Sequence, residues 1–215
     1  MRVVIAGGHG QIALHLERML REQRDEPVGL VRNPDHVPDL EAVGAEAVVL
    51  DLEKASVAEV AKALDGADAV VFAAGGGPSS GAARKETVDK GAAILLADAA
   101  EQAGVRRYAM VSSMGAEKAD PDSDEIFQVY LRAKKAADDY LRSGGLDWTI
   151  VRPGALTDDE GTQQVMVGEQ LDRGQIPRAD VAATLVAVLH TPTTIGKTFD
   201  LLTGTESIPA ALEHL

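Results

Sequence analysis

The sequence of 215 residues predicts an α/β fold, in which helices cover both faces of a doubly wound parallel sheet in three layers, αβα. Three observations predict it. Short apolar segments alternate with longer segments of helical spacing, at about 25 to 40 residues per unit, as in βαβ crossovers. Hydrophobic residues make up 45% of the chain and aromatic residues only 3%, which suits β-branched strands under alanine-rich helices. A glycine-rich turn also follows the first apolar segment.

The short apolar segments are bounded by charged residues or glycine and are the expected strands. They are Arg2–Ala6, Pro27–Val31, Ala45–Leu50, Ala69–Ala73, Arg107–Ser112 and Trp148–Arg152. The segments between them carry apolar residues at helical spacing. The expected helices are Ile12–Gln23, Val57–Leu64, Thr87–Ala103 and Glu125–Arg142.

The chain after Pro153 is more polar, and its periodicity is weaker. We expect a helix over Arg178–His190 and a strand in the segment GKTFDLL, residues 196–202. In doubly wound sheets, ligands bind beyond the carboxyl ends of the strands. We therefore expect residues 1–215 to form a single domain, in which the residues from about 155 to 215 contribute a small C-terminal lobe on the substrate side.

Charge and composition exclude several kinds of protein. With 34 acidic and 21 basic residues the formal net charge is −13, so a nucleic-acid-binding face is not expected. The absence of cysteine excludes disulfides and thiol catalysis, and the five histidines show no metal-ligand spacing, so we expect no metal site. No apolar run approaches the roughly 18 residues of a membrane span. We expect a cytoplasmic monomer or weak homodimer that acts on a small molecule and binds no membrane.

The first turn carries glycine where a phosphate-binding turn needs it. In the stretch VVIAGGHGQIALHL, Gly7, Gly10 and Ala13 are spaced G-x-x-G-x-x-A after the first strand. The first glycine permits a sharp turn, the second leaves room for a pyrophosphate, and the small third residue lets the helix pack on the strand. The helix that begins near Gly10 presents free N–H groups to the anion. We predict a Rossmann-type dinucleotide site with a turn made of Gly7, Gly8, His9, Gly10, Gln11 and Ile12.

The end of the second strand indicates which dinucleotide is bound. NAD sites usually have an acidic residue there, whereas the 2′-phosphate of NADP needs a cation. The sequence VGLVRNP supplies Arg32, followed by Asn33, and no acid. A charge-assisted hydrogen bond from arginine is worth about 1.5–3 kcal/mol. We therefore predict that NADP(H) is preferred, with NAD(H) as the alternative cofactor and a merely solvated Arg32 as the alternative interpretation.

An ordered series of motifs spans nearly the whole chain: GGHGQIA, VRNP, LDLE, FAAGGG, TVDKGA, MVSSMGA, YLRAK and VRPGAL. In this order they resemble the short-chain dehydrogenase/reductase superfamily, in its atypical NAD(P)H-binding branch of NmrA-like and biliverdin-reductase-B-like proteins. The resemblance implies further cofactor contacts, from the adenine to the nicotinamide, at Asp51, Leu52, Ala73, Ala74, Gly75, Pro153, Gly154 and Ala155. The chain departs from the pattern at Ala13, usually a glycine, and in AAGGG, which lacks an asparagine common in better-known members.

The motif YLRAK places Tyr130 and Lys134 four residues apart in a helical segment, so that both side chains face the same way. A free phenol titrates near pH 10, and an ammonium about 4 Å away favours the phenolate by roughly 4 kcal/mol at an effective dielectric constant of about 20. The resemblance implies that Tyr130 exchanges a proton with a substrate oxygen, while Lys134 assists it and binds the nicotinamide ribose. It also implies a serine on the same oxygen, with Ser113 as first choice and Ser112, which would also border the cofactor, in reserve.

The sequence thus predicts an NADP(H)-dependent oxidoreductase that transfers hydride to or from a small carbonyl-type substrate, with Tyr130 as acid/base. Two alternatives stay open. A sugar epimerase or dehydratase dependent on NAD(P) uses the same Tyr–Lys machinery, and an NmrA-like redox sensor binds the dinucleotide without chemistry. A sensor has no need of Tyr130 and Lys134, so this pair favours an enzyme, although the same spacing also occurs by chance in many helices.

Overall fold

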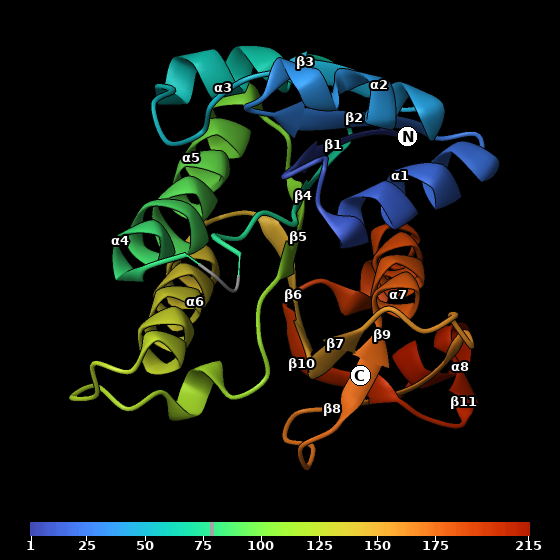
Figure 1. Ribbon diagram of the computed structural model, residues 1–215. Coiled ribbons are helices and arrows are strands. Elements are labelled where there is room, and N and C mark those ends of the chain that lie inside the picture. Colours follow the sequence, from blue (N-terminus) through green and yellow to red (C-terminus); the bar gives the residue numbers. More distant parts are fainter. Residues whose placement is uncertain (78–79) are drawn as a thin grey trace.

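The computed structural model describes residues 1–77 and 80–215 and arranges them in three layers, with a sheet between two layers of helices (Figure 1). The strands are β1 (Arg2–Ala6), β2 (Glu26–Val31), β3 (Glu46–Val49), β4 (Ala69–Phe72), β5 (Arg107–Val111), β6 (Asp147–Pro153), β7 (Ala155–Thr157), β8 (Gln164–Gly168), β9 (Gln175–Pro177), β10 (Lys197–Thr203) and β11 (Glu206–Ser207). The α-helices are α1 (Gln11–Glu22), α2 (Val37–Ala42), α3 (Val57–Ala63), α4 (Ala82–Arg84), α5 (Ala93–Ala103), α6 (Ile126–Ser143), α7 (Arg178–His190) and α8 (Ile208–Leu212). A π-helix, η2 (Lys85–Ala92), joins α4 to α5, and the 3₁₀-helices are η1 (Pro34–His36), η3 (Ala116–Lys118) and η4 (Pro192–Thr194).

Nine of the strands in the described part of the chain form one sheet, in the order β11-β8-β10-β6-β5-β4-β1-β2-β3. The strands from β10 to β3 pair in parallel, whereas β8 and β11 at one edge pair antiparallel. The chain begins inside the sheet at β1, winds outward through β2 and β3, and returns to β4 on the other side of β1. This is the doubly wound Rossmann-type arrangement, and it confirms the fold class predicted from the sequence.

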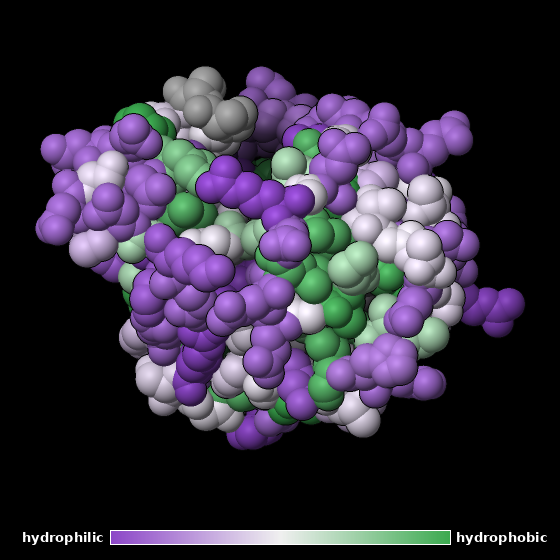
Figure 2. Space-filling model, turned by 90° about the horizontal axis from the view of Figure 1, so that it is seen from below, coloured by the Kyte–Doolittle hydropathy of each residue, from purple (hydrophilic) through white to green (hydrophobic). Residues whose placement is uncertain are grey.

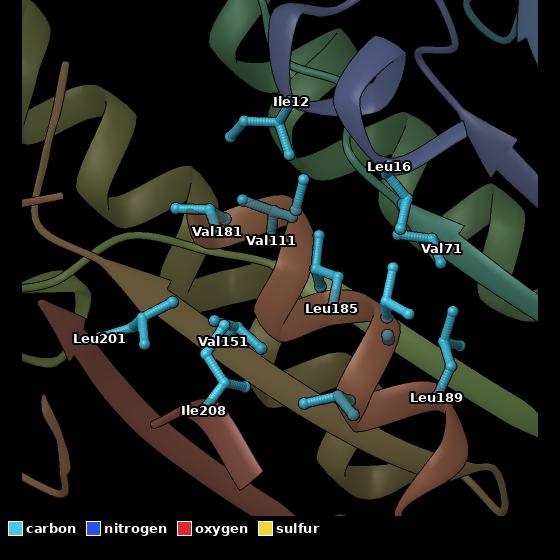
Figure 3. Close-up of a cluster of buried hydrophobic side chains, with 14 of the residues drawn as sticks. Ile12, Leu16, Val71, Val111, Val151, Val181, Leu185, Leu189, Leu201 and Ile208 are labelled. Carbon is cyan, nitrogen blue, oxygen red and sulfur yellow. The ribbon is translucent and has the colours of Figure 1, made fainter. Parts of the chain in front are cut away.

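Alternating side chains of the central strands supply two hydrophobic cores, one on each face of the sheet. In β1, Val3 and Ile5 belong to the core under α1, α7 and α8, whereas Val4 belongs to the core under α3, α5 and α6. Figure 3 shows the first core, in which Leu16 of α1 and Leu185 of α7 point toward the sheet. Because both faces are covered, the strands are continuous apolar runs.

Most of the predicted helices and strands are present, and their bounds differ little from the predicted ones. The six strands predicted before Pro153 end within one residue of the expected positions, as do α1, α3, α6 and α7. The helix expected over Thr87–Ala103 begins two residues earlier, as the π-helix η2, and continues as α5. The tail after Pro153 adds β8, β10 and β11 to the main sheet and α7 to one of its faces, while β7 and β9 form a small parallel sheet of their own. In the described residues, no helix has both the length and the apolar character needed to cross a membrane.

A carboxyl group is buried under the first turn. Glu17 of α1 is fully buried, and neither of its carboxyl oxygens has a hydrogen-bond partner among the described residues. A Cβ on Gly29 of β2 would lie 2.5 Å from Glu17 Oε1, and a Cβ on Gly8 would lie 3.0 Å from it. The two glycines therefore make room for the carboxyl group. Burial raises the pKa of Glu17 to about 8, so the group is protonated near neutral pH.

This carboxyl group is expected to make stability fall as the pH rises. An unfolded glutamate titrates near about 4.3, so between that value and about 8 the folded state binds one more proton than the unfolded state. The free energy of unfolding therefore decreases with pH across this window. Glu17→Gln removes the titration and should stabilise the protein by roughly 3–4 kcal/mol at about pH 8 and by little at about pH 5, as measured by urea unfolding.

Glu22→Gln is the matched control, because Glu22 is exposed at the end of the same helix. It should leave the difference in stability between the two pH values unchanged. A Glu17→Gln variant with the pH dependence of the wild type would contradict the buried, protonated carboxyl group.

Candidate functional site

The candidate site lies beyond the carboxyl ends of β1 and β4, where the winding of the sheet reverses. Gly7 directly follows β1 and has a φ of +84°, a left-handed conformation that favours glycine. A Cβ on Gly7 would lie 2.6 Å from the Cα of Ala74, which follows β4. Glycine therefore lets the two loops approach each other this closely.

The glycine turn leads into the N-terminus of α1. Gly10 caps the helix with an extended backbone, φ −68° and ψ 149°, and no described side chain caps the first turn. A Cβ on Gly10 would lie 3.1 Å from the carbonyl oxygen of Gly7. Free N–H groups and the positive end of the helix dipole bind anions such as a diphosphate. The residues of the turn therefore fit the diphosphate of a dinucleotide.

Two cavities adjoin at this turn and share residues 73–75 and 77. The first has a volume of about 320 Å³ and extends from the glycine turn over the ends of β2 and β3. The second has a volume of about 680 Å³ and extends past the end of β5 to α6. Among the described residues, no group of three or more His, Asp or Glu side chains is placed to hold a metal ion.

The first cavity is lined by half of the residues that were predicted to bind the cofactor: Gly7, His9, Gly10, Arg32, Asp51, Leu52, Ala73, Ala74 and Gly75. Arg32 is exposed at the end of β2, and its Nη1 donates to Glu53 Oε2 at 3.2 Å. Arg84 of α4 donates to the same oxygen, also at 3.2 Å. Arg84 was not predicted, because only the fold brings α4 to this rim. Two guanidinium groups thus converge on one carboxylate.

Four predicted cofactor residues line neither of these two cavities: Gly8, Gln11, Asn33 and Ala155, the last of which faces a neighbouring cavity. Gly8 is buried against β2. The side chain of Asn33 accepts a hydrogen bond from the N–H of Asp35 at 3.1 Å and so caps η1. Gln11 is exposed, and its Nε2 donates to Asp158 Oδ1 at 3.5 Å. These positions are therefore not part of the walls of the two adjoining cavities.

Tyr130 and Lys134 of α6 both line the second cavity, as their spacing predicts. Tyr130 is half-buried, whereas Lys134 is almost fully buried. The Lys134 Nζ donates to the carbonyl oxygen of Val111 at 3.0 Å and lies 3.6 Å from Asp89 Oδ1. It also lies 5.8 Å from the centre of the Tyr130 ring. The ammonium group is thus held in the same cavity as the phenol, where Ile12, Pro153 and Gly154 also form part of the wall.

The two candidate serines differ in what they bind, although both line the second cavity. Ser113 is half-buried, and its Oγ donates to the carbonyl oxygen of Met114 at 3.3 Å. Ser112 is almost fully buried, and its Oγ donates to Asp138 Oδ2 at 2.9 Å. A buried carboxyl group therefore holds the Ser112 hydroxyl, whereas Ser113 is the more exposed of the two serines.

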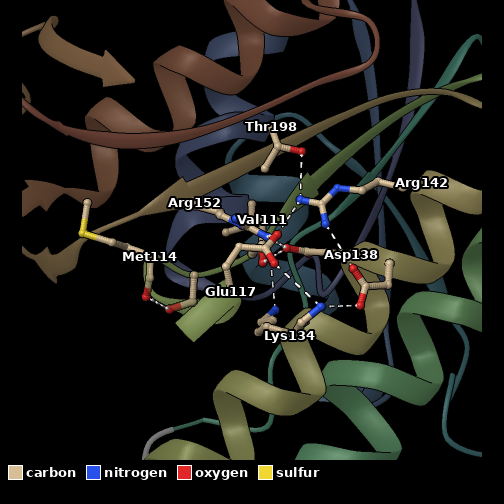
Figure 4. Close-up of polar contacts among 12 residues, drawn as sticks. Val111, Met114, Glu117, Lys134, Asp138, Arg142, Arg152 and Thr198 are labelled. Atoms are coloured by element: carbon tan, nitrogen blue, oxygen red, sulfur yellow. Dashed lines mark hydrogen bonds and ion pairs between the residues drawn. The ribbon is translucent and has the colours of Figure 1, made fainter. Parts of the chain in front are cut away.

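A buried ion pair supports this wall of the cavity (Figure 4). Arg152 of β6 donates from Nε and Nη2 to Asp138 Oδ2, at 3.0 and 2.7 Å, and from Nη2 to Glu117. Burial raises the pKa of Asp138 although Arg152 opposes the shift, and a hydrogen bond from Arg152 lowers the pKa of Glu117 to about 2. Because Ser112 binds the same Asp138 oxygen, this ion pair fixes the loop after β5.

Two buried charged residues of the second cavity were not predicted. The π-helix η2 brings Lys85 and Asp89 into its wall, and both are almost fully buried. The Lys85 Nζ donates to the carbonyl oxygen of Gly77 at 2.7 Å and lies 5.1 Å from the centre of the Tyr130 ring. The motif TVDKGA contains Asp89, so this residue had a signal in the sequence, whereas Lys85 had none. Short π-helical segments are frequent at functional sites.

Comparisons with known proteins agree with this geometry. Residues 7–192 match the model of a protein family described as NAD(P)H-binding. The chain belongs to this NAD(P)H-binding family. This membership confirms the NAD(P)H-binding character that the resemblance implied.

Relatives that span the whole chain carry epimerase and oxidoreductase names. A Bacillus subtilis protein named as the uncharacterized sugar epimerase YhfK is 38% identical over 216 residues, which cover 100% of both chains. A solved structure from Bacillus halodurans, provisionally described as an NAD-dependent epimerase/dehydratase, is 40% identical, covers 100% of both chains and has a TM-score of 0.92. The oxidoreductase YlbE from Lactococcus lactis is 30% identical, with coverage of 100% of this chain and 96% of its own and a TM-score of 0.88.

Proposed function

We propose that the protein is an NADP(H)-dependent oxidoreductase that reduces a carbonyl group on a small molecule, or forms one in the reverse direction. The observation that carries this proposal is that Tyr130 and the buried Lys134 lie in the cavity that adjoins the glycine turn. The turn fits a diphosphate. Residues 73–75 line both the first cavity, beside the turn, and the second cavity, which contains Tyr130 and Lys134.

A bound NADPH supplies the hydride for a carbonyl carbon. The hydroxyl group of Tyr130 donates its proton to the carbonyl oxygen, so that C=O becomes CH–OH, and the phenolate regains a proton from water. Lys134, held by the Val111 carbonyl group and Asp89, stabilises the phenolate by its positive charge. Ser113 donates a hydrogen bond to the same substrate oxygen and holds it in place.

Consumption of NADPH tests this proposal. The purified protein is mixed with NADPH and a panel of ketones, aldehydes and quinones, and the loss of NADPH absorbance is followed. We expect turnover with at least one of these classes. Tight binding of NADPH without turnover on any of them would favour the redox sensor instead.

Epimerisation is the second candidate, because the Bacillus subtilis relative is named as a sugar epimerase. Tyr130 would then first remove and later return a proton, and the cofactor would end in the state in which it began. Incubation with nucleotide sugars, followed by nuclear magnetic resonance, separates the two candidates. An epimer formed without net change in NADPH supports the epimerase.

We further propose that NADP(H) is the preferred cofactor, because Arg32 and Arg84 converge at the rim of the first cavity and share a single carboxylate, Glu53. Arg32→Ala should weaken NADPH binding by about 10- to 100-fold, since a charge-assisted hydrogen bond is worth about 1.5–3 kcal/mol. The Kd for NADH should change by less than about threefold. Calorimetric titration of both nucleotides measures the two constants.

Arg106→Ala is the control. Arg106 directly precedes β5, at the end of the strand away from the candidate site, and it pairs with Asp147. It should leave both constants unchanged. Equal weakening of NADPH and NADH by Arg32→Ala would reject the assignment of Arg32 to the 2′-phosphate.

A further inference from the structure

The second cavity is positively charged within an acidic chain. The formal net charge of the protein is −13. The charged groups described in the wall of this cavity are nevertheless three cations, Lys85, Lys134 and Arg178, and one carboxylate, Asp89. Arg178 has its own partner, Asp158, at 2.6 Å. The excess positive charge therefore lies at the two lysines.

The two lysines flank a single buried carboxylate. The Lys134 Nζ lies 3.6 Å from Asp89 Oδ1, and the Lys85 Nζ lies 4.0 Å from Asp89 Oδ2. The second of these oxygens already accepts a hydrogen bond from the N–H of Gly76 at 3.1 Å, and Oδ1 has no hydrogen-bond partner among the described residues. The cluster carries one net positive charge and is almost fully buried, which is unfavourable unless an anion pairs with it.

Lys85 has hydrogen-bond donors to offer to such an anion. An ammonium group carries three N–H donors. In the described part of the chain, the Lys85 Nζ hydrogen-bonds only the carbonyl oxygen of Gly77, and Asp89 lies beyond hydrogen-bond distance. Because the Lys85 Nζ lies 5.1 Å from the centre of the Tyr130 ring, an anionic group bound there would lie beside the proposed proton donor.

Part of the cavity wall is apolar. Ile126, Phe127 and Leu156 line the cavity, although 46%, 58% and 37% of their respective surfaces are exposed. The ring of Phe127 lies 6.0 Å from that of Tyr130. Figure 2 shows hydrophobic surface gathered along the middle of one face, between hydrophilic flanks. Exposed apolar residues around a polar centre are typical of a site for a molecule with an apolar body.

We infer, on the basis of the proposed function, that the substrate is a carbonyl compound with an apolar body and a carboxylate group. Lys85 binds the carboxylate with its unused N–H donors, and the charge of the lysine pair is then balanced. Ile126, Phe127 and Leu156 contact the apolar body. Lys85 is thus the residue that determines specificity for acids over neutral carbonyl compounds.

Binding of unreactive ligands tests this inference independently of turnover. Phenylacetate and its neutral counterpart phenylacetamide are titrated calorimetrically into the protein saturated with NADP⁺. The wild type should bind the acid about 10- to 100-fold more tightly than the amide, the range expected for a charge-assisted hydrogen bond. Lys85→Gln should remove this preference and leave the affinity for the amide within about threefold.

Two further variants control for net charge and for folding. Lys90→Gln makes the same charge change on η2, but Lys90 lies outside this cavity wall and pairs with Glu86 at 3.0 Å, so the preference should persist. Lys85→Arg keeps the charge and should retain most of the preference. The Kd for NADPH and the thermal unfolding midpoint of each variant show whether the fold and the cofactor site are intact.

The outcomes separate this inference from the proposed function. A wild type that binds the amide as tightly as the acid, or a Lys85→Gln variant that weakens both ligands equally, overturns the inference even if neutral carbonyls are turned over. A Lys85→Gln variant that weakens NADPH itself assigns Lys85 to the cofactor and also overturns it. A preference for the acid that depends on Lys85, in a protein without any turnover, supports the carboxylate site and rejects only the oxidoreductase.

Discussion

Tyr130→Phe is expected to lower kcat by about 10²- to 10⁴-fold, the usual contribution of a positioned general acid, and to change the Kd for NADPH by less than about threefold. The substitution removes the hydroxyl group that donates the proton and keeps the ring, which lies 6.0 Å from that of Phe127. It removes no hydrogen bond of Lys134, whose Nζ stays bound to the carbonyl oxygen of Val111. NADPH consumption gives kcat, and calorimetry gives Kd.

Tyr140→Phe is the matched control for this prediction. Tyr140 lies on the same helix, but its hydroxyl group donates to Asp98 at 2.5 Å and lies in neither of the two adjoining cavities. We expect its kcat to stay within about twofold of the wild type. If Tyr130→Phe kept full activity, or if the two variants lost activity equally, Tyr130 would not be the proton donor.

Arg152→Met is expected to lower the free energy of unfolding by about 3–5 kcal/mol, because it leaves a buried carboxyl group without its charge partner. Asp138 is fully buried, and Arg152 donates two hydrogen bonds to its Oδ2. The Oδ1 atom of Asp138 has no hydrogen-bond partner among the described residues, so nothing described there replaces the lost bonds. Urea unfolding at neutral pH measures the change.

Two further variants test whether the loss of stability comes from the buried ion pair. Arg142 also donates to Glu117, at 2.9 Å, but 27% of its side chain is exposed, so Arg142→Met should cost at most about 1 kcal/mol. The double variant Arg152→Met/Asp138→Leu removes both charges and should recover much of the stability, since an apolar pair often replaces a buried ion pair without loss. If Arg142→Met and Arg152→Met lowered the free energy of unfolding by equally small amounts, the buried pair of Arg152 and Asp138 would not be important for stability.

The sheet and the glycine turn could be predicted because both depend on local patterns. Strands buried on both faces are continuous apolar runs, and Gly7 and Gly10 stand at fixed distances after the first of them. The pair Tyr130 and Lys134 could be predicted for the same reason, because one helix carries both residues and its geometry alone puts them on one side.

Residues whose position depends on the path of the chain could not be predicted in this way. Arg84, Lys85 and Asp89 reach the cleft only because the segment after β4 folds back as α4 and a π-helix beside α6. The short helix α2 was missed because it has six residues and contains Pro38. The cap that the Asn33 side chain provides for η1 was not predicted either, because it depends on the turn that follows β2.

The transfer of deuterium from the cofactor to a substrate tests the central claim most directly. NADPH with deuterium at its transferable position is incubated with the ketone or aldehyde that gives turnover, and the mass of the product is measured by mass spectrometry. We expect one deuterium on the carbinol carbon of the product with the wild type, and far less product with Tyr130→Phe in the same time. Bound NADPH that passes no deuterium to any ketone or aldehyde, or a carbinol product without the label, would contradict it.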